Sequence, residues 1–201
     1  MALALFHHPQ TTHLTIIAGY ESGHTTVSQF SSNNWSVIYT SQVHTQPILS
    51  LDVSPLKDAY LTSSADAIIA KHPIPVTPEN IIMAVQNLPL KTVQTKHSGQ
   101  QGLRVRNDGK IFATAGWDTK VRVYSTKSMK ELAVLKWHKE GCFAVAFADV
   151  VEQETREGDE KAVVKTIGTI NVKDERLWKA KNAHWLAVGS KDGKVSLWDI
   201  Y

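Results

Sequence analysis

The stretch "GKIFATAGWDTKVRVY", residues 109–124, returns near the end of the chain as "HWLAVGSKDGKVSLW", residues 184–198. Both copies begin with a short apolar run that is rich in strand-forming residues. A Gly and an Asp follow, and these two residues favour a tight turn. An alternating run then resumes. Each copy therefore predicts a β-hairpin, written twice in one chain.

The second strand of each hairpin alternates apolar and polar residues. We expect the polar residues Arg122 and Ser196 to face outward, while the branched apolar residues on either side of them face inward. Under this interpretation, one face of each hairpin is buried and the other is in solvent.

Composition limits the classes of protein to consider. The chain has 201 residues, 42% of them hydrophobic and 20% charged, which is typical of a globular protein. The net charge is +3 and no run of basic residues occurs, so direct nucleic-acid binding is not expected. No apolar run reaches the roughly 18 residues of a membrane span, and "MALALF" at the start is too short for a secretory signal. Because Cys142 is the only cysteine, we expect an intracellular protein without disulfides.

Weaker copies of the hairpin indicate a repeat. Residues 13–30 and 58–72 keep the apolar run, the small residues and the second apolar pair. The first spacing fits the roughly 40–45 residues of one propeller blade, and the later spacings need insertions. A proline-rich stretch at 73–89 and a charged stretch at 152–183 supply them.

Two further strands separate successive hairpins, so each unit contains four strands. A histidine stands between the outer strand of one unit and the inner strand of the next, at His44, His97 and His138. This pattern predicts an all-β, WD40-type β-propeller. We expect one partial propeller domain over residues 1–201 with four visible blades, as units near 13–43, 44–90, 91–137 and 138–201.

The repeated polar residues predict a hydrogen-bonded set in each blade. In a WD blade this set joins the loop His, the turn Asp, a Ser or Thr four residues before that Asp, and an aromatic residue six after it. Buried polar groups of this kind must be paired. The matching positions are His44, Thr62, Asp66 and His72 in the second unit, His97, Thr114, Asp118 and Tyr124 in the third, and His138, Asp192 and Trp198 in the fourth. Val188 replaces the fourth Ser or Thr, and the first unit offers only Ser22 at the Asp position.

We interpret these residues as structural, because they recur once per unit and a single active site does not. No catalytic, cofactor-binding or metal-binding residue is expected, since no phosphate loop, zinc motif or nucleophile elbow occurs. A Cys142 nucleophile paired with His138 is the alternative, but a small buried strand residue is the favoured reading of Cys142. Trp117, at the turn of the best hairpin, is the candidate partner contact. Its alternative is packing against the adjacent loop.

The string "ATAGWD", with "VRVY" and "LAVLKWH" after it, resembles the fungal family of ASTRA-associated protein 1, whose animal relative is guanine nucleotide-binding protein beta-subunit-like protein 1. The terminal "WLAVGSKDGKVSLWDIY" and the charged insertion before it strengthen the resemblance, which is specific over the C-terminal half. The resemblance implies a seven-bladed propeller, of which this chain is the C-terminal part. Four units closed by no further strand would expose sheet edges and would associate.

The resemblance also implies a function. It points to a non-catalytic scaffold subunit of the ASTRA assembly, a chromatin regulator of the nucleus, with the cytoplasm as a second location. The implied partners are a kinase-like subunit, its maturation co-chaperones and an AAA+ ATPase pair, with no cofactor and no membrane. Two rival functions remain from the residues alone: a G-protein β-like signalling or adaptor propeller, and a propeller enzyme.

Overall fold

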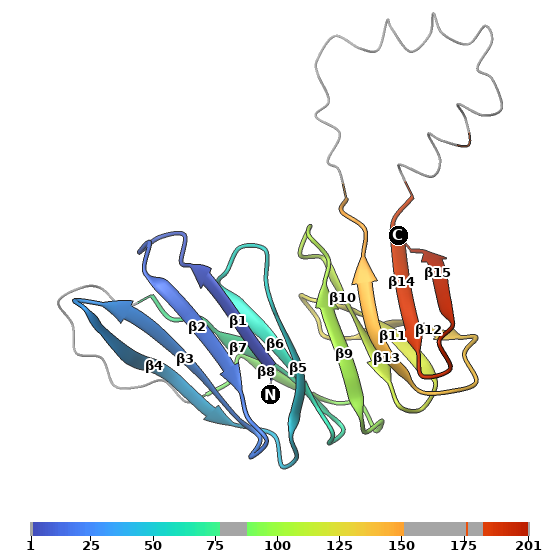
Figure 1. Cartoon of the computed structure of the whole chain (residues 1–201), viewed down its shortest axis with the longest axis horizontal. Helices are drawn as coiled ribbons and strands as arrows, with labels where there is room; N and C mark the ends of the chain where they lie inside the picture. The colour runs from blue at the N-terminus through green and yellow to red at the C-terminus, as the bar shows by residue number, and fades with distance from the viewer. Residues whose placement is uncertain (1, 77–87, 151–175, 177–182, 201) are drawn as a thin grey trace, which may run out of the picture.

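The computed structural model describes residues 2–76, 88–150, 176 and 183–200. In these residues the chain folds into four antiparallel β-sheets (Figure 1). The charged insertion expected at 152–183 lies almost wholly outside the described residues, as does most of the one expected at 73–89. The strands are β1 (Ala2–His7), β2 (Leu14–Gly19), β3 (His24–Ser31), β4 (Asn34–Gln42), β5 (Ile48–Val53), β6 (Ala59–Ser64), β7 (Ile68–Pro73), β8 (Lys91–Gln94), β9 (Gln100–Val105), β10 (Ile111–Gly116), β11 (Lys120–Ser125), β12 (Glu131–Lys136), β13 (Cys142–Phe147), β14 (Trp185–Ser190) and β15 (Val195–Asp199).

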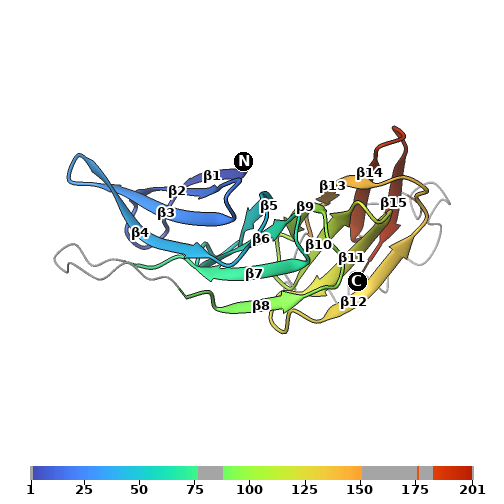
Figure 2. The ribbon, with the colours of Figure 1, turned by 90° about the horizontal axis from the view of Figure 1, so that it is seen from below.

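Consecutive strands pair within each sheet. The sheet orders are β1-β2-β3-β4, β5-β6-β7-β8, β9-β10-β11-β12 and β13-β14-β15. The first strands of neighbouring sheets contact one another, β1 with β5, β5 with β9, and β9 with β13. The sheets therefore fan out from a shared inner edge, with the first and fourth sheets at opposite ends of the arc (Figures 1 and 2). This arrangement confirms the predicted all-β, partial WD40-type propeller.

The sheet boundaries differ from the expected units in two places. The first sheet starts at Ala2, where no strand was expected, because β1 pairs along its whole length with β2. The second sheet extends to Gln94, because β8 pairs with β7 rather than with a strand of the third sheet. The sheets span residues 2–42, 48–94, 100–136 and 142–199.

A hydrophobic cluster fills each junction between neighbouring sheets, and the described strands build three such clusters. Alternate residues of one strand enter different clusters: Ile111 and Ala113 face the fourth sheet, whereas Phe112 faces the second. This period-2 division is what a sheet covered on both sides requires. The principal side chains are Ile17, Val27, Leu51 and Tyr60 at the first junction, Leu61, Ile69, Leu103 and Phe112 at the second, and Val121, Val123, Val145 and Leu186 at the third.

The hairpins at residues 109–124 and 184–198 lie in different environments, and two predictions about them are wrong. Arg122 does not face outward, because it is buried between the second and third sheets. Ser196 is half-buried and turned toward the third sheet, while Val195 and Leu197 on either side of it are exposed. Among the described residues, the third sheet is covered on both faces, whereas the fourth sheet is covered on one face only. The predicted alternation between the two faces of each strand is present, but the buried and exposed faces were not assigned correctly.

Two polar side chains on β5 link the inner strands of the second and third sheets. Asp52 accepts the backbone N–H of Val105 through Oδ2 at 2.8 Å, and Ser50 Oγ accepts the N–H of Leu103 at 3.1 Å. Sequence reasoning missed both, although their alternation in "ILSLDV" was the signal. No helix in the described part of the chain is long and apolar enough to cross a membrane.

Candidate functional site

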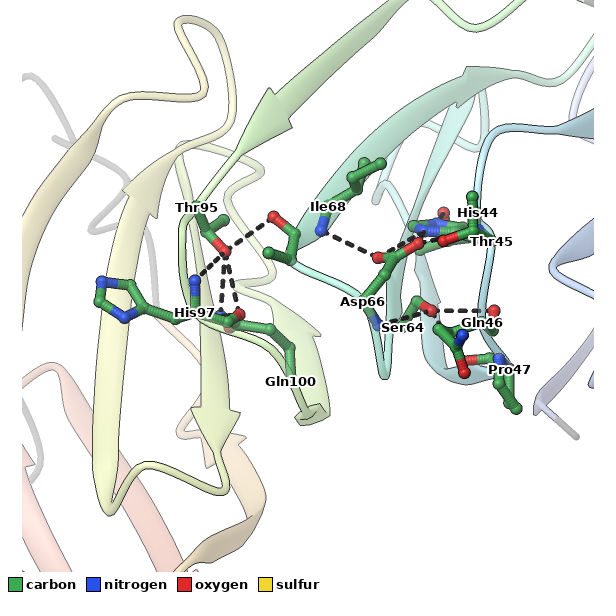
Figure 3. A network of polar contacts seen from close by, with 12 residues as sticks. His44, Thr45, Gln46, Pro47, Ser64, Asp66, Ile68, Thr95, His97 and Gln100 are labelled. Atoms are coloured by element: carbon green, nitrogen blue, oxygen red, sulfur yellow. Dashed lines mark hydrogen bonds and ion pairs between the residues drawn. The ribbon is translucent and has the colours of Figure 1, made fainter.

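The turn between β6 and β7 is held by Asp66. Its carboxylate accepts the backbone N–H groups of Ile68 at 2.9 Å and of Thr45 at 3.0 Å, and it lies 3.2 Å from His44 Nδ1 (Figure 3). Two of these three partners belong to the loop that leads from the first sheet into the second. Asp66 therefore ties its own turn to the neighbouring loop.

From His44 a chain of hydrogen bonds runs across the junction into the first sheet. Thr62 Oγ1 lies 2.8 Å from His44 Nε2 and 2.9 Å from His72 Nε2, and His72 Nδ1 lies 2.9 Å from Tyr39 Oη. All four side chains are buried. The structure thus brings together His44, Thr62 and Asp66, with His72 at the aromatic position.

Only one assignment of protons satisfies this chain. Asp66 is an acceptor, so His44 donates from Nδ1 and its Nε2 accepts from the Thr62 hydroxyl. Thr62 then accepts from His72 Nε2, and His72 Nδ1 accepts from Tyr39. Burial lowers the pKa of His72 to about 3, with a smaller effect from His44, and this favours the neutral form of the His72 ring. Burial also lowers the pKa of His44, and the Asp66 carboxylate only partly opposes this.

The third sheet does not repeat this set. Asp118 is held by two hydrogen bonds from Arg122, at 3.1 Å and 2.6 Å, while His97 Nδ1 lies 3.7 Å away from it. Burial alone would raise the pKa of Asp118, but the Arg122 guanidinium outweighs burial and the pKa is lowered. The ring of His97 points away from Thr95 and Gln100, with which its backbone is bonded (Figure 3).

Thr114 and Tyr124 are buried beside the Arg122 guanidinium. Neither hydroxyl makes a hydrogen bond of standard length and angle. Burial raises the pKa of Tyr124 to about 12, with Arg122 and the nearby Thr114 hydroxyl opposing the rise. Of the four residues predicted for the third unit, the structure places His97 near Asp118 and Thr114 near Tyr124. An ion pair between Asp118 and Arg122 replaces the set that was expected to join all four.

In the fourth sheet a different hydroxyl occupies the centre of the set. Ser196 Oγ lies 2.8 Å from His138 Nε2 and accepts the indole N–H of Trp198 at 2.8 Å. Asp192 takes no part, because it pairs with Lys194 at 2.7 Å at the tip of the turn. That hydrogen bond lowers the pKa of Asp192 to about 2. His138 and Trp198 are therefore brought together, but through Ser196 and without Asp192.

One strand position accounts for all three arrangements. The residue paired with Thr62 across the ladder is Ala70, the residue paired with Thr114 is Arg122, and the residue paired with Val188 is Ser196. Alanine leaves Thr62 free to bond His44, arginine captures the turn Asp, and serine supplies the hydroxyl that valine lacks. The family pattern does not specify this position, so sequence reasoning missed it.

Trp117 lies at the β10–β11 turn and is 46% exposed. Its Nε1 donates to Gln101 Oε1 at 3.0 Å, and its ring covers Gly99, where an added Cβ would come within 2.1 Å of the indole. Gly99 also has a φ of +71°, so a glycine is required there twice over. One side of the ring therefore packs on the adjacent loop and the rest is open, so the role of Trp117 as a partner contact stays a prediction.

A surface depression of about 470 Å³ adjoins Trp117. It joins the third and fourth sheets at the end where the Asp turns and His loops lie. Aromatic side chains are enriched at protein interfaces, and two of them, Trp117 and Phe143, line this depression. We call this depression the Trp117 surface; it is lined by Gln101, Trp117, Glu140, Gly141, Phe143 and Lys191.

The residues that would serve an enzyme are not assembled in the described part of the chain. Cys142 is buried, which raises the pKa of its thiol to about 11, and no hydrogen bond joins it to His138. No group of three or more His, Cys, Asp or Glu side chains is placed to hold a metal ion within the described ranges.

Comparison with known proteins agrees with this framework. The family WD domain, G-beta repeat, matches residues 89–125 and 177–199. The fold is that of a partial WD40-type propeller. A solved structure, the computationally designed Ika4 protein, superposes with a TM-score of 0.62 at 14% identity, covering 100% of this chain and 90% of that one, so the likeness concerns the fold alone.

The resemblance to ASTRA-associated proteins is confirmed by fungal relatives with that name. ASTRA-associated protein 1 of Verticillium alfalfae is 54% identical over 100% of this chain and 50% of its own length. The Aspergillus niger protein is 53% identical over 83% of this chain and 42% of its own length. The Pyricularia oryzae protein is 38% identical over 100% of this chain and 61% of its own length. The WD-repeat chain spans about half the length of the curated relatives it matches.

Proposed function

We propose that this chain is a non-catalytic WD-repeat subunit of an ASTRA assembly, and that it works by holding other proteins together. The observation that carries the proposal is the 54% identity to an ASTRA-associated protein over 100% of this chain. The absence of an assembled catalytic or metal site among the described residues is compatible with it. We extend the proposal to a nuclear location, to chromatin remodelling, and to the kinase-like subunit, its co-chaperones and the AAA+ ATPase pair as partners.

The Trp117 surface is the proposed contact. Hot spots of protein interfaces are enriched in Trp, and they lie beside a polar rim. Trp117 is half open, Phe143 is exposed next to it, and Lys191 and Glu140 supply the rim charges. The indole is already fixed by Gln101 and Gly99, so a partner would find it with little conformational entropy left to lose.

Affinity purification of the tagged chain from fungal cells tests this function. Recovery of a kinase-like protein, co-chaperones and an ATPase pair is the expected result. We expect Trp117→Ala and Lys191→Glu to lower that recovery at least severalfold. The matched controls are Trp137→Ala, an exposed Trp outside the Trp117 surface, and Lys130→Glu, an exposed Lys at the opposite end of β11 and β12. Recovery of general folding chaperones alone would reject the scaffold function, and equal losses in the controls would reject the surface.

A further inference from the structure

The Trp117 surface has two aromatic walls that do not touch each other. Trp117 comes from the β10–β11 turn and Phe143 from β13, and they are 46% and 39% exposed. Neither ring contacts another aromatic ring in the described ranges. Gly141 keeps the space beside both walls open, because a Cβ there would lie 3.4 Å from Trp117 Cα and 3.7 Å from Phe143 Cζ. All residues that line the surface belong to the third sheet, the fourth sheet and the loop between them.

Glu140 and Lys191 line the same surface and leave their charges unpaired. Neither side chain makes a hydrogen bond or an ion pair in the part of the chain that the structure describes. Lys194 in the same turn as Lys191 shows the contrast, because it pairs with Asp192 at 2.7 Å. One depression thus presents an acid and a base that do not bind each other.

The backbone that carries these two charges is fixed by hydrogen bonds. Ser190 Oγ lies 3.2 Å from the carbonyl oxygens of Glu140 and Gly141. The Lys191 N–H donates to the Gly141 carbonyl at 2.9 Å. The loop before β13 is therefore tied to the β14–β15 turn, and a partner meets both charges on a framework with little backbone entropy left to lose.

A partner that covers this surface removes water from Glu140 and Lys191. A charge that is buried without a counter-charge is strongly unfavourable, so a partner that offered only an apolar side chain to the rings would bind weakly. The chemistry calls for a base opposite Glu140 and an acid opposite Lys191. Arginine is the base that also suits the rings, because its planar guanidinium stacks on aromatic faces and binds a carboxylate through two hydrogen bonds.

We propose that the Trp117 surface binds an extended segment of a partner protein through one arginine and one nearby acidic residue. The arginine lies between the rings of Trp117 and Phe143 and binds Glu140, and the acidic residue binds Lys191. In an extended segment, two side chains point to the same side when they are two positions apart. This inference rests on the proposed function, because it gives the chemistry of the contact through which the chain is proposed to hold its partners.

Titration of the 201-residue chain with a synthetic pentapeptide is the direct test. The probe is acetyl-Ala-Arg-Ala-Asp-Ala-amide, and the readout is the indole N–H signal of Trp117 in a nitrogen–proton NMR spectrum, assigned with Trp117→Phe. We expect a saturable shift with a Kd on the order of 1 mM, because so small a ligand buries little surface. Citrulline keeps the shape of arginine without its charge, and leucine keeps only an apolar side chain. Peptides with either residue in place of arginine should bind at least about tenfold more weakly.

Four substitutions locate the two charged contacts. Glu140→Gln should weaken binding of the arginine peptide about tenfold, and Lys191→Gln should weaken it about threefold, because the acidic residue of the peptide stays closer to solvent. Glu21→Gln and Lys194→Gln are the matched controls, since Glu21 is an exposed acid in the β2–β3 turn and Lys194 an exposed base outside the surface. All four side chains are exposed, so none of these substitutions should unfold the chain.

Three results would overturn the inference. They are the lack of a saturable shift up to about 5 mM peptide, equal binding of the citrulline or leucine peptide, and equal losses in the two control variants. The affinity purification that tests the proposed function separates the two proposals. If Trp117→Ala lost the recovered partners and Glu140→Gln kept them all, the scaffold function would stand and the arginine contact would fail. If the wild-type chain recovered no ASTRA partner, the function would fail, and the titration alone would decide whether the surface binds arginine.

Discussion

The second and third sheets secure the same turn with different chemistry. In the second, Asp66 anchors a chain of neutral hydrogen bonds through His44, Thr62 and His72. In the third, Asp118 is bound by a buried arginine, and the loop histidine stays at 3.7 Å. The turn Asp and the loop His recur in both. What differs is the residue opposite the threonine, Ala70 in one sheet and Arg122 in the other.

This difference shows that a repeat fixes where a polar network lies but not which residues bond to one another in it. A neutral network depends on every member, because each buried group satisfies the next. An ion pair depends on two members, and it fails most severely when the buried partner is left alone. The two sheets should therefore respond in opposite ways to the same substitutions.

The largest effect is expected for Asp118→Ala. It leaves the Arg122 guanidinium buried without its main partner, and we expect a loss of about 3 kcal/mol, the low end for a broken buried pair, because Asp118 is 28% exposed. The free energy of unfolding from denaturant titration measures the loss. Asp118→Ala with Arg122→Met should recover part of it by removing the stranded charge. A double variant no more stable than Asp118→Ala would contradict the ion-pair interpretation.

Thr62→Val and Thr114→Val make the same substitution at equivalent positions of the second and third sheets, so their effects on stability can be compared directly. Thr62→Val removes a hydroxyl that bridges two buried rings, so it should cost about 2 kcal/mol. Thr114→Val removes a hydroxyl without a hydrogen bond of standard geometry, so it should be neutral or slightly stabilising. Thermal unfolding of both variants is the measurement. Equal losses would mean that the threonines act through packing alone.

The histidines of the second sheet should make stability depend on pH. The pKa of His72 is lowered to about 3 by burial, against about 6.5 in the unfolded chain. The unfolded state therefore binds more protons below pH 6.5, so stability is complete above that pH and is lost as pH falls toward 3. We expect about 2 kcal/mol of loss between pH 6.5 and pH 5. His72→Phe should flatten this slope, and a slope unchanged in that variant would assign the effect to other groups.

Features that recur in every blade could be predicted from the sequence, whereas features that depend on one residue in one blade could not. Strand periodicity, the Asp turns and the His loops recur, and they led to the propeller. Arg122 was placed in solvent because a charged residue in an alternating run is usually exposed, and only its ion pair with Asp118 makes burial tolerable. Strand β1 was missed because "MALALF" precedes no glycine turn. Ser196 was missed because its role depends on Val188, its partner across the ladder.

The smallest effects are expected in the fourth sheet, where a third pattern of hydrogen bonds is centred on Ser196. Ser196→Ala leaves the His138 ring and the Trp198 indole N–H without their shared partner, and should cost about 1 kcal/mol. Asp192→Ala removes only a surface pair with Lys194, so the unfolding midpoint should not move. Val188→Thr restores the hydroxyl that the family pattern expects, next to Ser196 on the paired strand. If Val188→Thr rescued Ser196→Ala in denaturant titration, either strand could supply the network with its hydroxyl. If Val188→Thr did not rescue Ser196→Ala, the residue paired across the ladder with the threonine position would determine the hydrogen-bond pattern of each blade.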